Sequence, residues 1–232
     1  DDTFFGWGGK GAKTATRDRK NPLATRLKVE EVVHVSNAEN FLGYCRRRDK
    51  VSAEYNKLPA AERAIDFDIK TKGMSFKGVS LHQDEPCDGS FNEYWLWHGT
   101  GEAGAAGITD KDFDLGRAGT AAGTMFGRGL YFAESCMKAD EYTQSDGRCW
   151  CPLVLSRVTL GRIKHCDHKE PHTIKDDLEA ACCSGSGRYH SVCGDREKVR
   201  GTFRELIVFD SDQVYPEYIV WYSRVEPFIS LK

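Results

Sequence analysis

Three short blocks, far apart along the chain, constrain its fold more than any other feature. They read HGT, MFGRGLYFAE and FRE, and they begin at His98, Met125 and Phe203. Their polar and ionisable groups are widely spaced, so they form one site only if the fold brings the blocks together. A chain of 232 residues is long enough for one large domain that does so, and we expect that domain to span 27–232. The Gly- and Lys-rich stretch 1–26 is expected to be an irregular lead-in.

Short runs of Val, Ile, Leu and aromatic residues predict that most of the domain is built from strands. These runs cover 27–35, 94–98, 131–132, 152–160, 205–209 and 218–222. Ser36 and Glu39 fit a capping box for a helix that runs to about Val51. Ser135 can cap a second helix that reaches Tyr142. The pattern therefore predicts a mostly antiparallel α+β domain with few helices.

Three other stretches carry weaker patterns. Between 58 and 92 the signals are mixed and include several Gly and Pro residues, which suggests an insertion. The stretch 161–201 is expected to be mostly loop. By contrast, 115–129 holds five glycines, and we expect it to lie close to a ligand because glycine lets the backbone approach.

The charge balance and the cysteines limit the classes of function. The 33 Lys and Arg nearly cancel the 35 Asp and Glu, so charge gives no argument for a nucleic-acid or anionic-membrane partner. No apolar run approaches the roughly 18 residues of a membrane-spanning helix, and the first residues lack the basic and apolar segments of a signal peptide. Nine irregularly spaced cysteines favour reduced thiols. We therefore expect a nuclear or cytoplasmic protein, not a secreted one.

Glu205 is the first candidate for a catalytic group. Phe203, Ile207 and Phe209 alternate with it along a predicted strand, so these side chains project to one face. A carboxylate among apolar neighbours is costly unless it is paired or hydrogen-bonded, which makes Glu205 a site candidate. Two other interpretations stay open: the carboxylate reaches water at a strand end, or it pairs with Arg204 or a distant lysine.

The other blocks supply groups that suit a flat, amide-bearing ring. His98 lies where a strand breaks into a Gly-rich turn, and Gly99 leaves backbone donors and acceptors open to a planar amide. Tyr131 and Tyr142 can present aromatic faces, and stacking on them is worth about 0.5–1.5 kcal/mol per pair beyond the area buried. Taken singly, each tyrosine is more often a core-packing residue.

With these residues the chain resembles the catalytic domain of poly(ADP-ribose) polymerases, including tankyrases, whose site is a His, Tyr and Glu triad. The resemblance lies in the HGT block, in 125–133, and in 205–209 with the Gln-containing turn and last strand that follow. It implies a two-sheet ADP-ribosyltransferase fold with NAD as the substrate. It also implies transfer of ADP-ribose to protein side chains, the chain itself included, with release of nicotinamide. A Glu at the third triad position implies that poly(ADP-ribose) can be elongated.

The resemblance assigns a role to each residue around the NAD. Gly99 would hold the nicotinamide carboxamide through its backbone, while Tyr131 and Tyr142 stack on the ring. His98 and Thr100 would contact the adenosine-side ribose. Further residues are expected near NAD or, for the last two, near the acceptor: Lys138, Arg117, Ala139, Met125 and Phe203.

Glu205 is the residue to which the resemblance assigns the chemistry. It would accept a hydrogen bond from the nicotinamide-ribose 2′-hydroxyl and orient the attacking group. As nicotinamide leaves, the ribose becomes cationic, and an anion aimed at that charge stabilises the transition state more than the ground state.

One position departs from the family pattern. Many members carry a serine three residues before the second tyrosine, where its hydroxyl meets the carboxamide, and Ala139 stands there in this chain. The change removes one polar contact, worth roughly 0.5–1.5 kcal/mol for an ordinary hydrogen bond. We therefore expect weaker NAD binding or a substitute donor.

Tankyrases also bind zinc just before the strand that begins here at Pro152. This chain keeps Cys149 and Cys151 but lacks the nearby His and the other Cys. Structural zinc needs four ligands, and other His and Cys residues would have to fold back to complete a site. We expect free thiols on a surface loop and no zinc.

Two other functions fit the same residues. An NAD glycohydrolase would use water as the acceptor and release free ADP-ribose. A non-catalytic member would bind NAD or ADP-ribose without reacting. The intact His98, Tyr131 and Glu205 argue against a binding module, whereas Ala139 argues mildly for it.

Overall fold

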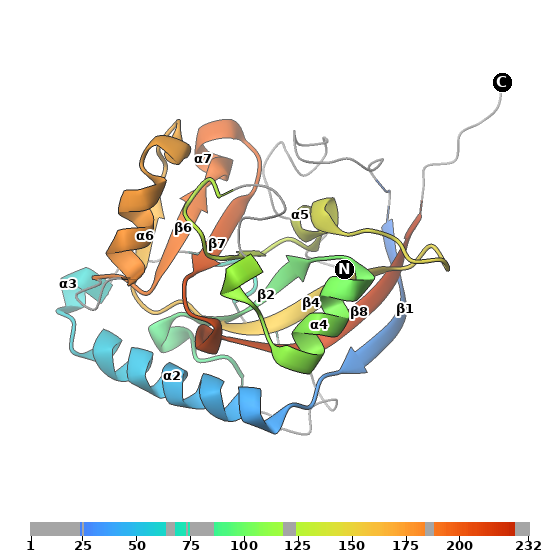
Figure 1. Cartoon of the computed structure of the whole chain (residues 1–232). Helices are drawn as coiled ribbons and strands as arrows, with labels where there is room; N and C mark the ends of the chain where they lie inside the picture. Colours follow the sequence, from blue (N-terminus) through green and yellow to red (C-terminus); the bar gives the residue numbers. More distant parts are fainter. Residues whose placement is uncertain are drawn as a thin grey trace.

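The computed structural model describes residues 24, 26–63, 68–72, 74, 86–117, 124–183 and 188–225. These residues form one sheet with the strand order β1-β8-β4-β2-β3-β7-β6-β5. The strands are β1 (Arg26–His34), β2 (Glu93–Gly99), β3 (Leu130–Ala133), β4 (Cys151–Thr159), β5 (Ile163–Cys166), β6 (Ser191–Asp195), β7 (Arg204–Val208) and β8 (Val214–Val225). Every described pairing is antiparallel except that of β5 with β6. The expected α+β class and mostly antiparallel arrangement are confirmed (Figure 1).

The sheet has two halves that meet between β2 and β3. These strands are joined through one residue pair, Trp97 with Ala133, whereas the other described pairs share at least four. The resemblance implies two sheets, and here the described strands of both halves form one continuous sheet. His98 lies near the end of β2, Tyr131 lies on β3, and Glu205 on β7 pairs with Ala133. The junction therefore brings all three sequence blocks together.

Helices flank the sheet. In the described residues they are α2 (Ala38–Asn56), α3 (Ala60–Arg63), α4 (Glu102–Lys111), α5 (Cys136–Ala139), α6 (Lys175–Cys183) and α7 (Arg196–Arg200). Short 3-10 turns are η2 (Gly89–Phe91), η3 (Leu115–Arg117), η4 (Asp140–Tyr142), η5 (Pro171–Thr173) and η6 (Ser211–Gln213). In Figure 1, α4 lies against β4 and β8, α6 lies beside β6, and α5 lies over β2 and β3. The short helix α5 thus covers the junction.

The largest apolar cluster packs on the strands of the junction. It includes Leu96 of β2, Phe132 of β3, Val154 of β4 and Leu206 of β7, all buried. Phe113, which follows α4, joins the same cluster. Close packing of this kind holds side chains in fixed rotamers, so the strands that carry the three blocks have a rigid support.

Helix α2 begins one residue later than the capping pattern predicts. Its N-cap is Asn37, whose side chain accepts the backbone N–H three residues on at 3.2 Å, whereas Ser36 is exposed outside the helix. The helix also continues past Val51 to Asn56, because Tyr55 is buried in the last turn. The helix itself is confirmed, but the predicted cap residue and end are wrong.

Replacing Asn37 with alanine is expected to lower the free energy of unfolding by about 1 kcal/mol, because the first turn of α2 loses a side-chain acceptor. Ser36→Ala is the matched control and should change it by less than about 0.5 kcal/mol, as surface substitutions usually do. Urea unfolding of both variants measures the difference. A larger loss of unfolding free energy in the Ser36 variant would show that Ser36 caps the helix.

The stretch 161–201, expected to be loop, contains β5, α6, β6 and α7. The prediction is wrong because these elements are short and show weak periodicity; the buried residue of α6, for example, is Leu178. Pairing determines them instead, since β6 lies between β5 and β7. Backbone pairing with a strand that is distant in sequence leaves little local signal.

Some expectations fall wholly or partly on residues outside the described ones. This holds for the lead-in 1–26, of which the structure describes Ala24 and Arg26. Strand β1 begins with Arg26. Of the segment 58–92 the structure describes 58–63, 68–72, 74 and 86–92. Ile69 in this segment is buried in the main apolar cluster. Whether 58–92 is an insertion stays a prediction.

Candidate active site

His98 and Tyr131 are held together across the junction. The Nδ1 of His98 lies 2.9 Å from the backbone oxygen of Tyr131. Because a carbonyl oxygen only accepts, Nδ1 carries the proton and donates it, and Nε2 of the neutral ring remains an acceptor. The imidazole packs edge-on against Phe113, with 5.1 Å between the ring centroids. The first two blocks therefore meet in space.

We expect His98 to stay neutral at a pH where an exposed histidine is half protonated. Burial lowers the pKa of His98 below its usual value of about 6.5, and the hydrogen bond to Tyr131 offsets part of this effect. The unfolded chain then binds a proton more readily than the folded one, so this residue's contribution to stability falls as the pH drops below about 6.5. Nitrogen NMR should show the neutral, Nδ1-protonated ring at about pH 6.5. Half protonation there would contradict this expectation.

The hydroxyl of Tyr131 ties its ring to the glycine-rich loop. It accepts the backbone N–H of Phe126 at 2.9 Å and donates to the backbone oxygen of Gly127 at 2.8 Å. Burial raises the pKa of Tyr131, and the charge of Glu205 adds to the increase. Tyr131 is thus a neutral phenol with a fixed ring, and it lies close enough to Glu205 for the charge of that carboxylate to raise its pKa.

Lys138 links α5 to the third block. Its Nζ donates to the hydroxyl of Tyr142 at 2.9 Å and to Glu141 at 2.8 Å, and it lies 3.6 Å from Oε1 of Glu205. Burial alone would lower the pKa of Lys138, but the charges of Glu205, Tyr142 and Glu141 outweigh burial and raise it. Lys138 is therefore a permanent cation beside the expected catalytic carboxylate.

The contacts of Glu205 decide between the interpretations left open by the sequence. Its side chain is 14% exposed, so it is not a carboxylate extended into water. Arg204 does not pair with it, because this arginine forms an ion pair with Glu134 at 2.7 Å. The cation near Glu205 is the distant lysine, Lys138. The carboxylate is thus largely buried, beside Lys138 of α5 and near Tyr131 of the second block.

The HGT block fits tightly between two helices. A Cβ added to Gly99 would lie 1.8 Å from the backbone oxygen of Ala139 in α5. On the other side, the hydroxyl of Thr100 would lie 2.0 Å from a Cβ added to Gly104 in α4. Glycine at position 99 is therefore required for α5 to lie over the end of β2. Ala139 is buried at this contact.

A network that the sequence analysis missed fixes the turn that carries Tyr142. Asp140 accepts hydrogen bonds from Tyr222 Oη and from Arg224 Nε, the latter at 2.8 Å. Arg224 also donates to the hydroxyl of Thr143 at 2.6 Å. Because Asp140 and Thr143 stand on either side of Tyr142, this network ties η4 to the end of β8. Its partners are 81 to 84 residues apart, so no local pattern indicates it.

The sequence matches the model of one known protein family over most of its length. The family model of the poly(ADP-ribose) polymerase catalytic domain matches residues 12–224, which include all three blocks. The chain belongs to the poly(ADP-ribose) polymerase catalytic domain family. The resemblance noted in the sequence is thereby confirmed.

Curated relatives of the chain include proteins of both polymerase and mono-transferase type. The chain is 24% identical over 173 residues to poly [ADP-ribose] polymerase tankyrase of Caenorhabditis elegans, covering 62% of the chain and 8% of the relative. It is 26% identical over 132 residues to protein mono-ADP-ribosyltransferase PARP12 of Homo sapiens, covering 57% and 17%. It is 23% identical over 205 residues to poly [ADP-ribose] polymerase of Sarcophaga peregrina, covering 79% and 20%. The matched part is a fifth or less of each relative.

The structure also describes the other residues that the resemblance assigns to the site. Arg117 ends η3 with an 81% exposed side chain and pairs with Asp114 at 3.5 Å. Met125 packs on the apolar cluster that Tyr131 also contacts. Phe203 is buried in a cluster with residues of α5. Their roles toward NAD and the acceptor stay predictions.

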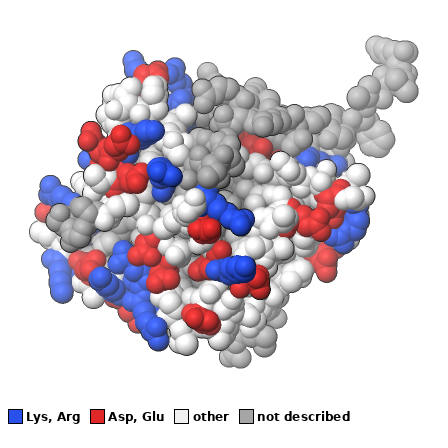
Figure 2. Space-filling model, in the orientation of Figure 1, with Lys and Arg blue, Asp and Glu red and all other residues white. Residues whose placement is uncertain are grey.

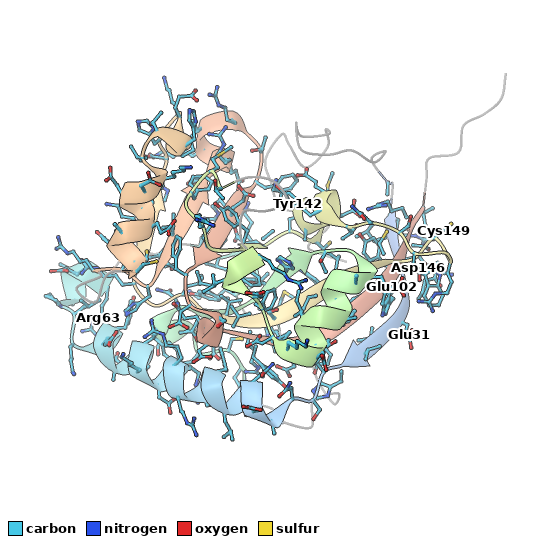
Figure 3. All side chains as sticks on the ribbon, viewed as in Figure 1. Glu31, Arg63, Glu102, Tyr142, Asp146 and Cys149 are labelled. Carbon is cyan, nitrogen blue, oxygen red and sulfur yellow. The ribbon has the colours of Figure 1, made fainter. Side chains whose placement is uncertain are left out.

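Cys149 and Cys151, the two cysteines considered as zinc ligands, lie at the end of a turn and differ in exposure. Their loop closes on Asp146, whose Oδ1 accepts the backbone N–H of Arg148 at 2.8 Å and that of Trp150 at 2.9 Å. Cys149 is exposed beside Asp146, as Figure 3 shows, whereas Cys151 is buried. Within the described ranges, no group of three or more His, Cys, Asp or Glu side chains is arranged to hold a metal ion.

The surface carries charges of both signs. Figure 2 shows Lys and Arg interspersed with Asp and Glu over one face. Among the helices that the structure describes, none is both long and apolar enough to cross a bilayer.

Proposed function

We propose that this domain transfers ADP-ribose from NAD to protein side chains and releases nicotinamide. The observation that carries the proposal is the meeting of the three blocks. His98 bonds to the backbone of Tyr131, and Lys138 connects Tyr142 with the vicinity of Glu205. Family membership supports NAD as the substrate.

Three residues would bind the nicotinamide end, and His98 would contact the adenosine-side ribose. Tyr142 is 37% exposed and so has ring surface available to a ligand, and the ring of Tyr131 is fixed by its hydroxyl. Gly99 would hold the carboxamide through its backbone. The Nε2 of His98 is an acceptor and suits a ribose hydroxyl.

In the proposed reaction the bond between the ribose carbon and the nicotinamide nitrogen breaks. Both electrons leave with nicotinamide, whose ring loses its positive charge, and the ribose becomes oxocarbenium-like. Glu205 accepts a hydrogen bond from the adjacent ribose hydroxyl and stabilises the developing cation. An oxygen of the acceptor then bonds to the ribose carbon. An acceptor hydroxyl passes its proton to Glu205, whereas an acceptor carboxylate has none to lose.

The domain is also proposed to elongate poly(ADP-ribose). Elongation uses a ribose hydroxyl as the acceptor, and Glu205 is the group that can orient it and take its proton. The names of the relatives cover both polymerases and a mono-ADP-ribosyltransferase. Glu205 is therefore the observation that favours polymer formation. The acceptors would include other proteins and the chain itself, in the nucleus or the cytoplasm, and zinc would play no part.

Incubation of the purified domain with NAD labelled in its adenine tests the proposal. Label attached to protein as a ladder on a gel supports elongation, and a single shifted band supports transfer of one unit. Label released only as free ADP-ribose would identify an NAD glycohydrolase. Calorimetric binding of NAD without release of nicotinamide over hours would identify a binding module.

A further inference from the structure

Glu141 is a buried carboxylate beside the candidate site that the proposed reaction does not use. Its side chain is 1% exposed. It belongs to η4, directly before Tyr142, and it lies three positions after Lys138. Residues at this spacing on a helix are neighbours, and here they form an ion pair at 2.8 Å.

Within the described part of the chain, two carboxylates lie within reach of Lys138, and its ammonium is at hydrogen-bond distance from one of them. Its Nζ is 2.8 Å from Glu141 and 2.9 Å from the Tyr142 hydroxyl, which are hydrogen-bond distances. The distance to Glu205 is 3.6 Å, which is beyond a hydrogen bond. The ammonium is thus close enough to Glu205 to interact with its charge but does not occupy its oxygens.

The bonding of Lys138 to Glu141 and not to Glu205 matters because, in the proposed reaction, Glu205 needs its oxygens for the substrate. A buried ammonium that loses a hydrogen-bond acceptor is costly, so it moves toward the nearest anion. Without Glu141, the nearest carboxylate among the described residues is Glu205, and a short charge-assisted bond to Lys138 would form there. Such a bond would compete with the ribose hydroxyl and reduce the negative charge that faces the cationic sugar.

We propose that Glu141 is a positioning residue that holds Lys138 away from Glu205 and so keeps the Glu205 carboxylate available to the ribose of NAD. The inference rests on the proposed function for its catalytic consequence. Its structural part, the place of the Lys138 ammonium, is independent of turnover.

Glu141→Met tests the proposal, because methionine has a similar length but neither charge nor strong acceptor. We expect kcat for nicotinamide release to fall by about tenfold or more while KM for NAD changes by less than about threefold. Glu141→Gln keeps an acceptor oxygen for Lys138 and should restore most of the loss. In a Lys138→Met background, Glu141→Met should cause little further loss, since its effect acts through the lysine. Equal losses in both backgrounds, or no rescue by Gln, would overturn the proposal.

A crystal structure of the Glu141→Met variant gives a readout that does not depend on activity. The proposal predicts that Nζ of Lys138 moves from 3.6 Å to a hydrogen-bond distance of about 2.8–3.0 Å from Glu205. An ammonium that stays in place would contradict it. If the unaltered domain releases no nicotinamide, the proposed function fails, and this structure still decides the role of Glu141.

Discussion

Glu205→Gln is expected to slow nicotinamide release and ADP-ribose transfer by roughly 100- to 1,000-fold, the usual cost of removing one group aimed at transition-state charge. NAD affinity should change by no more than about threefold, because the carboxylate acts mainly on the charge that develops as the bond breaks. The substitution keeps the shape of the side chain, which is 14% exposed and lies 3.6 Å from Lys138. Single-turnover kinetics together with calorimetry separate the two effects.

The matched control is Glu93→Gln, which alters another buried carboxylate outside the three blocks. Glu93 accepts hydrogen bonds from the Tyr44 hydroxyl and from the backbone N–H of Asp88. Loss of its charge should lower stability, as changes to buried charged hydrogen bonds do, and leave kcat within about twofold. A wild-type rate in the Glu205 variant would remove that carboxylate from the mechanism.

Gly99→Ala is expected to have the largest effect on structure. The added methyl would lie 1.8 Å from the backbone oxygen of Ala139 and 2.7 Å from its carbonyl carbon. A backbone contact cannot be relieved by a rotamer change, so α5 would have to move away from β2 and take Lys138 and Tyr142 with it. We expect the free energy of unfolding to fall by about 3 kcal/mol, the upper part of the usual range for overpacking. NAD affinity should fall by about tenfold or more, through lost ring stacking and burial.

Gly107→Ala in α4 is the control for this substitution. Nothing lies within 4 Å of a Cβ added there, so alanine should raise stability by about 0.4–1 kcal/mol through its helix propensity and the restricted unfolded chain. The two variants should therefore shift the urea midpoint in opposite directions. Normal NAD binding by a stable Gly99 variant would show that α5 does not depend on this contact.

The parts of the fold that the sequence predicts are those with strong local patterns. The strands with Leu96, Val154 and Ile207 are dense runs of apolar residues, and the burial of these residues follows directly. The sequence predicts Ser36 as the cap of α2 because Glu39 completes a capping box with it, whereas the structure places Asn37 at the N-cap. The elements of 161–201 depend on pairing between strands, which composition does not reveal.

In the candidate site, too, local patterns indicate some features, whereas others depend on contacts between distant parts of the chain. Glu141 could have been found from its spacing to Lys138, since acid and base three apart on a helix commonly pair. The network of Asp140 with Arg224 could not, because only the fold places the end of β8 beside η4. The fit of Gly99 against Ala139 likewise depends on how α5 crosses the junction.

A crystal structure of the domain with nicotinamide bound would show whether the three blocks form one nicotinamide pocket. We expect the carboxamide on the backbone of Gly99, the ring between Tyr131 and Tyr142, and the ring nitrogen facing the side of the site where Glu205 lies. Nicotinamide bound elsewhere, with these side chains unchanged and uncontacted, would contradict this expectation.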